Sequence, residues 1–213
     1  VPGAPTNLVA TKGNGQVTLT WTAPASNGSA LTNYLVTPSL GAQSLSPISV
    51  PAPATTATVT GLTNGQSYTF TVTAVNANGP GPASLSSQPV VPSTIPDTPT
   101  AVVATKANGS AQLTWVAPNN GGAAITSYVI TPYVGNQAGS PQVVSPTATS
   151  ATVTGLTNGQ TYTFTVTAVN VNGSSAASAA SNAVTPSAVP GAPTNLVATK
   201  GNGQVTLTWT APA

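Results

Sequence analysis

The stretch GLTNGQSYTFTVTAVN, residues 61–76, decides the fold of this chain. From Tyr68 onward apolar residues alternate with threonines, so one face carries the rings and aliphatic side chains and the other carries hydroxyls. A period of two is typical of a β-strand with one buried face. The Asn64-Gly65 pair just before it favours a turn, because both residues tolerate positive φ. The stretch therefore predicts a corner followed by a long central strand.

The same stretch returns at residues 155–170 as GLTNGQTYTFTVTAVN, after 94 residues. Residues 1–94 align on residues 95–188 without a gap, and the aromatic and leucine landmarks coincide: Trp21 with Trp115, Tyr34 with Tyr128, Leu62 with Leu156, and Tyr68 with Tyr162. A fixed period of this length indicates tandem structural units. We expect one domain over residues 1–94 and a second over residues 95–188.

A third copy opens at Val189. Residues 189–213 match residues 1–25 at all 25 positions, whereas residues 95–119 match them at only 14. The longer unit is therefore a pair of domains with a period of 188 residues, followed by the first two strands of a third copy. Since 25 residues cannot bury a core of their own, two explanations are open. Either the chain is a window of a longer array, or the tail completes a neighbouring molecule.

Regular structure is expected to be entirely β. Each repeat predicts seven short strands, in the first near residues 6–12, 15–22, 31–38, 43–50, 55–61, 66–76 and 83–91. Prolines are expected at strand edges and junctions, where they do not interrupt a central ladder: Pro2, Pro5, Pro24, Pro38 and Pro92. The short linkers at 92–96 and 186–190 begin and end in proline, which favours a semi-rigid string of sandwiches.

These landmarks resemble the fibronectin type III family. The resemblance rests on Pro5, Trp21, Tyr34, Leu62 and Tyr68 and on their counterparts in the second repeat. It implies a seven-stranded immunoglobulin-like β-sandwich, a core tryptophan on the second strand, and a tyrosine whose hydroxyl bonds back across the corner. The Arg-Gly-Asp integrin motif of some family members is absent from the matching loops, residues 77–82 (ANGPGP) and 171–176 (VNGSSA).

Charge is nearly absent. Lys12, Lys106 and Lys200 are the cations and Asp97 is the one acid, with no Glu, Arg, His, Cys or Met. General acid–base catalysis, a metal cluster and a catalytic triad all need side chains that the chain lacks. We expect no enzyme and no catalytic, cofactor-binding or metal-binding residue. Nucleic-acid binding and membrane insertion are not expected either, since the lysines are isolated and no long apolar run occurs.

The remaining candidate residues carry weak signals. Lys12 is expected to be a solubilising edge charge, and Asp97 a solvated linker residue. Asn27, Asn108 and Asn172 each begin an Asn-Gly-Ser glycosylation pattern, which in an Asn- and Ser-rich chain we interpret first as turn composition; an attached glycan is a possibility that the sequence does not localise. Tyr133 replaces Ser39 of the first repeat, and a partly covered ring is expected.

The functional hypothesis is a structural one. An almost uncharged surface reduces repulsion between copies and favours side-by-side association or an acidic, salty exterior; lineage-specific composition is an equal alternative. The sequence favours a bacterial extracellular or cell-surface fibre, stalk or adhesin that self-associates, with residues 189–213 shared head-to-tail between molecules. The chain starts at Val1 without a signal segment, so a mature product or an excerpt is expected. The runner-up is a spacer or binding module of a secreted polysaccharide-degrading enzyme.

Overall fold

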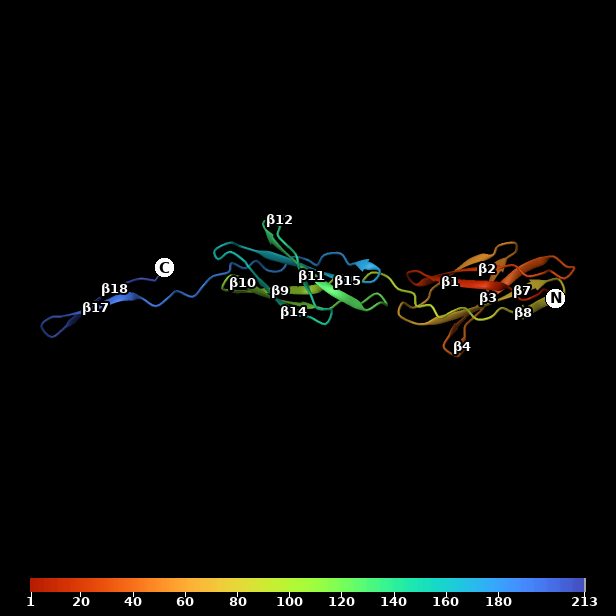
Figure 1. The fold of residues 1–213 in the computed structure, drawn as a ribbon, viewed down its shortest axis with the longest axis horizontal. Coiled ribbons are helices and arrows are strands. Elements are labelled where there is room, and N and C mark those ends of the chain that lie inside the picture. The colour runs from red at the N-terminus through yellow and green to blue at the C-terminus, as the bar shows by residue number, and fades with distance from the viewer. Residues whose placement is uncertain (213) are drawn as a thin grey trace.

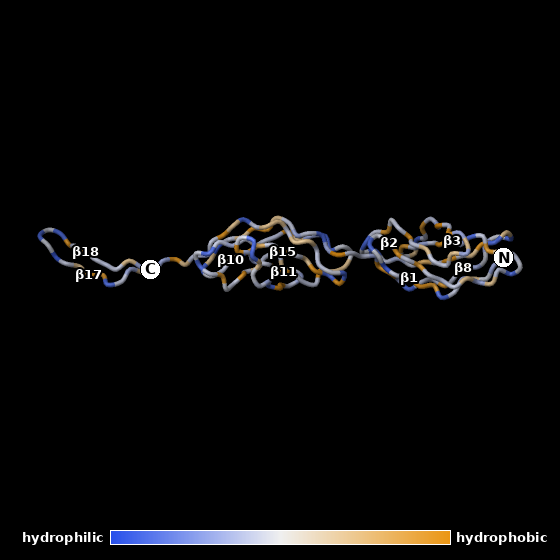
Figure 2. Tube along the Cα trace, turned by 90° about the horizontal axis from the view of Figure 1, so that it is seen from above, coloured by the Kyte–Doolittle hydropathy of each residue, from blue (hydrophilic) through white to orange (hydrophobic). Residues whose placement is uncertain are grey.

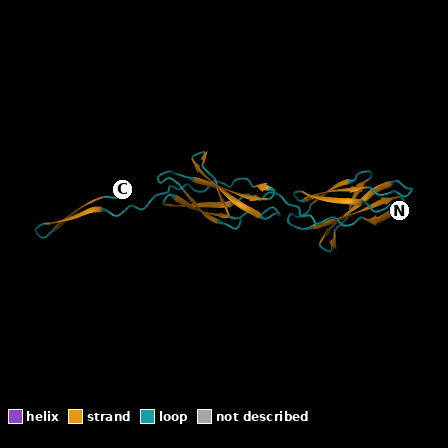
Figure 3. Cartoon of the chain, viewed as in Figure 1, coloured by secondary structure: helices purple, strands orange, loops and turns teal. Residues whose placement is uncertain are grey.

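The computed structural model describes residues 1–212, and every regular element in that range is a β-strand. Two β-sandwiches lie end to end along the long axis, and a separate two-stranded hairpin follows them at the C-terminal end (Figure 1). Loops and turns connect the strands throughout (Figure 3). The prediction of an all-β fold is confirmed. Over residues 1–212 no helix is present that could cross a membrane.

The first sandwich consists of two antiparallel sheets. One contains β1 (Thr6–Lys12), β2 (Gln16–Thr22) and β6 (Thr56–Thr60), in the order β1-β2-β6. The other is built around β3 (Leu31–Leu40) and β7 (Tyr68–Asn76), with β4 (Gln43–Ser44) and β5 (Ile48–Pro51) beside β3 and β8 (Gly79–Ala83) beside β7. Strand β7, the stretch that recurs in the sequence, is therefore the centre of the larger sheet.

The second sandwich repeats this plan. Its smaller sheet contains β9 (Thr100–Ala107), β10 (Ser110–Val116) and β14 (Ser150–Thr154). Its larger sheet contains β11 (Ile125–Val134), β12 (Gln137–Ala138), β13 (Gln142–Val144), β15 (Thr163–Asn170) and β16 (Gly173–Ser174). The tail hairpin, β17 (Thr194–Lys200) and β18 (Val205–Thr210), forms a sheet of its own.

Each sandwich has its core between the two sheets. Along β7 buried and half-buried residues alternate strictly, as the sequence predicts. Trp21 from the smaller sheet packs edge-on against Tyr34 from the larger one, with ring centroids 5.2 Å apart, and Trp115 and Tyr128 repeat the contact at 5.4 Å. Because inward and outward residues alternate, apolar positions are interspersed with polar ones along both sandwiches (Figure 2).

The corner before β7 is the predicted tyrosine corner. The hydroxyl oxygen of Tyr68 accepts a hydrogen bond from the backbone nitrogen of Thr63 at 3.1 Å. Tyr162 and Thr157 form the same bond at 3.1 Å in the second sandwich. The hydroxyl thus fixes the chain where it enters the central strand.

The predicted strand at 83–91 is wrong. Strand β8 ends at Ala83, and the following segment contacts β7 at every third residue through Ser84, Ser87 and Val90. Each serine donates its backbone N–H to a carbonyl of β7 and accepts a β7 N–H with its side-chain oxygen. A period of three is that of a polyproline II helix rather than of a strand.

Two further expectations need correction. The strand expected near 43–50 is interrupted, because β4 and β5 pair with different parts of β3. Pro38 lies inside β3, not at an edge. Its carbonyl accepts from the Leu45 backbone nitrogen on the β4 side, so the missing N–H also faces that side, where the pairing with β5 has ended. The ladder to β7 is therefore uninterrupted.

Candidate functional site: the domain junction and the tail hairpin

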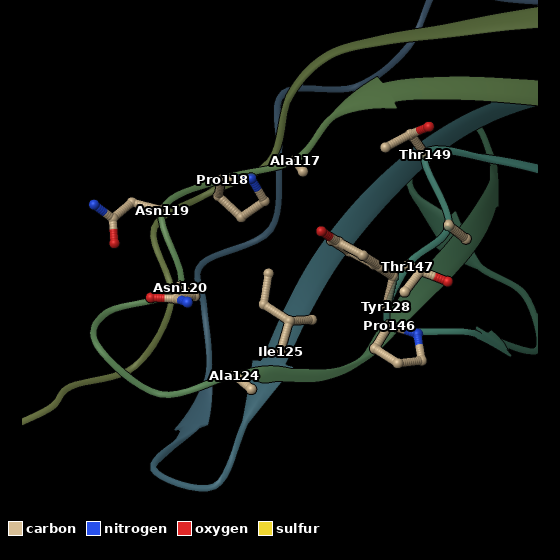
Figure 4. Close-up of a pocket in the computed structure, with 11 residues that line it drawn as sticks. Ala117, Pro118, Asn119, Asn120, Ala124, Ile125, Tyr128, Pro146, Thr147 and Thr149 are labelled. Carbon is tan, nitrogen blue, oxygen red and sulfur yellow. The ribbon is translucent and has the colours of Figure 1, made fainter. Parts of the chain in front are cut away.

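One groove on the second sandwich is lined by no carboxylate, histidine, cysteine or lysine. It is an open depression of about 820 Å³ on the second sandwich. Ile125, Tyr128 and Pro146 lie together on its wall, with Asn119 and Asn120 on the neighbouring loop (Figure 4). Burial raises the pKa of the Tyr128 hydroxyl, and the indole of Trp115 partly offsets that shift. Within residues 1–212 no group of three metal-ligating acids, histidines or cysteines occurs.

The linker between the two sandwiches is bonded to both of them. On the first side, Ser93 N donates to Gly13 O at 3.1 Å, and Pro92 O accepts from Gly65 N at 2.9 Å. On the second side, Thr94 N donates to Gly121 O at 2.8 Å, and Asp97 N donates to Asn119 O at 2.9 Å. Successive linker residues are therefore anchored on opposite domains, which restricts the rotation of one domain against the other.

A polar side-chain cluster reinforces the linker. Lys12 Nζ donates to Ser93 Oγ and to Asn172 Oδ1, each at 3.1 Å. The Asn172 amide nitrogen donates to Ser93 Oγ at 3.1 Å and to Thr94 O at 2.9 Å. We call Lys12, Ser93, Thr94 and Asn172 the junction cluster. Lys12 thus bonds across the domain boundary, beyond the edge-charge role expected of it, because its partner lies 160 residues away in sequence.

Two glycines allow the loops of the two domains to touch. A Cβ atom on Gly122 would lie 2.8 Å from the backbone carbon of Asn64, and one on Gly121 would lie 2.6 Å from Thr94 O. Both distances are shorter than real Cβ contacts, so only glycine fits this approach. Asp97 lines the polar cleft beside the contact, of about 720 Å³, and is the one carboxylate there.

Comparison with known proteins agrees with this architecture. The family model described as "Fibronectin type III domain" matches residues 3–90 and 97–184. The chain belongs to the fibronectin type III family. Two solved structures are similar to it: the chicken CNTN1 FN1–FN3 domains, at 18% identity and a TM-score of 0.47, covering 98% of this chain and 75% of that one; and a two-domain fibronectin type III segment of chicken tenascin, at 19% identity and a TM-score of 0.45, covering 85% and 98%. No curated protein matches the chain in sequence.

The outer ends of the two fibronectin type III domains show what the junction covers. Gly121 is buried and Asn172 half-buried, whereas Asn27 and Asn78, which occupy the same positions in the first domain, are exposed. Ser93 is buried, whereas its counterpart Ser187 is exposed. The burial of these positions therefore comes from the neighbouring domain and not from the fold of either domain alone.

The tail hairpin is the second candidate surface. It has the sequence of β1 and β2, but every residue of β17 and β18 is exposed. Trp209 is 57% exposed, against 5% for Trp21 at the same position of the first domain. The chain therefore presents the core face of a fibronectin type III domain with nothing packed on it in residues 1–212.

The other predicted residues lie as follows. Tyr133 is half-buried on β11, as expected. Of the three glycosylation patterns, Asn27 is exposed and Asn108 accepts a hydrogen bond from Asn158 at 2.8 Å. Asn172 belongs to the junction cluster, where a glycan would displace its bonds to the linker. The sequence did not identify Asn172, Gly121 and Gly122 as junction residues, because each of them lies in an ordinary Asn- and Gly-rich turn pattern.

Proposed function

We propose that this chain is a non-catalytic structural section of an extracellular or cell-surface fibre, stalk or adhesin. The observation that supports the proposal is the junction, where the linker and the junction cluster bond both domains into one extended unit. A rod of this kind transmits position and force along its length, and it needs no reactive group. The side chains in the grooves and at the junction are suited to packing and hydrogen bonding.

The surface composition supports an exterior location. Charged residues make up 2% of the sequence, against about a quarter in an average soluble protein. A surface of hydroxyls and amides keeps nearly the same charge over a wide range of pH and salt. It also leaves little electrostatic repulsion between neighbouring copies. These properties suit a protein that works beside many identical copies outside the cell.

Self-association is part of the proposal. The partial third copy would join one molecule to the next, head-to-tail, by supplying the first two strands of a domain whose own residues 1–25 are displaced. Deleting residues 189–213 tests this mode. The assemblies should become shorter or disappear, and assemblies of unchanged length would rule out a role for the tail.

The same rod could serve as a spacer or accessory module of a secreted polysaccharide-degrading enzyme. Sugar-binding faces use rows of exposed aromatics, whereas Trp21, Tyr34, Tyr68 and Phe70 are buried in the first core. Retention of the chain on insoluble chitin or cellulose would favour this second function over the first.

Electron microscopy of the native material tests the main proposal. We expect fibres or stalks on the cell exterior whose axial repeat corresponds to one domain or to the two-domain unit. The measurement should be paired with labelling by an antibody raised against residues 1–213, applied to intact cells. Labelling only after permeabilisation, or particles of a single monomer size, would contradict the proposal.

A further inference from the structure

The tail hairpin already has the conformation that its twin adopts inside the first domain. The pairing of β17 with β18 has the same register as that of β1 with β2, with the same irregularity near its start. Asn7 and Asn195 have φ values of 53° and 54°. Asn195 bonds to Thr210 at 3.1 Å, as Asn7 bonds to Thr22 at 3.2 Å. The hairpin is therefore preorganised, and docking requires little ordering of its backbone.

The docking face is the row of alternate residues on β18. Val205, Leu207 and Trp209 are 64%, 51% and 57% exposed. Their counterparts in the first domain, Val17, Leu19 and Trp21, are 0%, 0% and 5% exposed. Three neighbouring large apolar side chains on one strand face form a patch of the kind that marks an interaction site.

The first domain shows what covers this face. Strand β2 pairs with β1 along one edge and with β6 along the other, from Gln16 opposite Thr60 to Thr20 opposite Thr56. Its apolar residues pack in one core with residues from β3, β6 and β7, among them Val36, Val59 and Phe70. All of these partners lie within residues 26–94. We call the surface that they form the acceptor face.

The acceptor face of the second domain is a poorer match. The first core contains Val17 and Val36, where the second contains Ala111 and Ile130. In the second domain the smaller residue, Ala111, lies on the hairpin, and the larger residue, Ile130, lies on the acceptor face. The tail carries Val205 at this position, as the first domain carries Val17. Placed against Ile130 it would add volume to a core that is already filled, and overpacking of this kind is unfavourable.

We propose that the tail hairpin binds the acceptor face of a first-type domain, residues 26–94 of a second copy, when residues 1–25 of that copy are absent or displaced. This deepens the head-to-tail association proposed above and rests on it for the identity of the partner. In a closed copy, residues 1–25 already cover the acceptor face. Replacing them with the tail hairpin of another molecule would cover one hairpin and expose an identical one, while association costs translational freedom. A closed copy is therefore a poor acceptor and an open one is a good acceptor.

Titration of the 1–213 chain with fragment 26–94 tests the proposal. The fragment contains no tryptophan, and Trp21 and Trp115 are already buried, so a change in emission reports on Trp209. We expect a one-to-one complex, a blue shift, and protection of Trp209 from acrylamide quenching. Fragment 120–188 should bind about fivefold or more weakly.

Matched variants separate docking from non-specific collapse. Leu207→Ala should weaken the complex by about thirtyfold or more, because its counterpart Leu19 is fully buried. Thr208→Ala should leave it unchanged, since its counterpart Thr20 is exposed in the docked hairpin. Equal binding by the Leu207→Ala variant, or equal binding of the two fragments, would overturn the proposal.

A chain of residues 26–213 provides a second test of hairpin docking, and this test needs no isolated fragment. It should form end-to-end oligomers whose mass rises with concentration. The 1–213 chain should shorten them, since it donates a tail but its own acceptor face is filled, and the 1–188 chain should not. If 26–213 remains monomeric and Trp209 stays open to quenching in both experiments, the tail is not a docking element. That result would contradict hairpin docking but not the proposed structural role of the two-domain rod. A flexible junction would contradict the rod but not hairpin docking.

Discussion

At the scale of single residues, the ring and the hydroxyl of Tyr68 have separate roles. The ring is buried and belongs to the first core. The hydroxyl oxygen lies 3.1 Å from the backbone nitrogen of Thr63 and closes the corner before β7. Burial of the ring stabilises the core through its area, while the hydrogen bond fixes the direction in which the chain enters the central strand.

Replacing Tyr68 with phenylalanine should separate these roles. The ring stays in place and the bond to Thr63 is lost, so the free energy of unfolding of the first domain should fall by about 1 kcal/mol. Urea unfolding followed by NMR signals of the first domain measures this. The second domain, whose corner depends on Tyr162, provides the internal control. A loss in both domains, or in neither, would show that the corner bond does not act locally.

Residues whose role depends on alternation were predictable, and residues whose role depends on distant partners were not. Trp21, Tyr34 and Phe70 follow from the period of two and the repeat. Asn172 resembles an ordinary turn residue, because its partners Lys12 and Ser93 lie 160 and 79 residues away. Local sequence patterns contain no information on contacts between domains, so the residues of the junction cluster can be recognised only from the three-dimensional structure.

At the scale of elements, the segment after β8 replaces a strand by serine contacts. Ser84 and Ser87 are buried, and their side-chain oxygens accept from the backbone nitrogens of Val72 and Phe70 at 3.0 and 3.1 Å. Ser178 and Ser181 repeat this arrangement in the second domain. The sequence indicated an extended segment here but not its period, because serines and prolines also occur in ordinary edge strands and loops.

Ser87→Ala should destabilise the first domain by about 1–3 kcal/mol, because the buried N–H of Phe70 loses its acceptor. Ser86→Ala is the matched control. Ser86 is exposed, so its change should stay within about 0.5 kcal/mol. Hydrogen exchange at the Phe70 amide and urea unfolding provide the measurements. Equal effects of the two substitutions would mean that the Ser87 oxygen does not replace a strand partner.

At the scale of the whole molecule, the two ends of a domain are not equivalent. Gly121 receives the linker at the entrance to the second domain, and Asn27 stands at the same place in the first. The Asn27 amide donates to Val1 O at 3.0 Å, so the first domain has a side chain beside Val1 where the second domain has none beside Ile95. In an array with a period of two domains, successive junctions would therefore differ.

Gly121→Asn should loosen the junction without unfolding either domain. Asparagine accepts the positive φ of this position, as Asn27 does at φ 53°, but its Cβ would clash with Thr94 O. We expect unchanged unfolding midpoints and a larger spread of inter-domain angles in small-angle X-ray scattering. Asn27→Gly, which alters the outer end alone, should leave the scattering unchanged. A Gly121→Asn chain that scatters like the parent would show that the close approach does not hold the junction.

The stability of the molecule should depend little on pH below pH 9. The chain has three lysines, one aspartate and no histidine, so few protons are bound or released on unfolding. Burial raises the pKa of Tyr128 above its ordinary value of 10.0. A raised pKa in the folded state gives stability that is complete below the unfolded value and is lost as pH rises through the folded one. Thermal melts should therefore be flat to about pH 9 and fall above pH 10; a decline between pH 5 and 8 would contradict this.

The central claim is that the linker and the junction cluster join the first two domains into one rigid unit. Residual dipolar couplings measured on the intact chain test it most directly. We predict that residues 6–83 and residues 100–174 share a single alignment tensor, with the domain orientation of Figure 1. Two tensors of clearly different magnitude for these segments would show that the domains reorient independently, and would contradict the account.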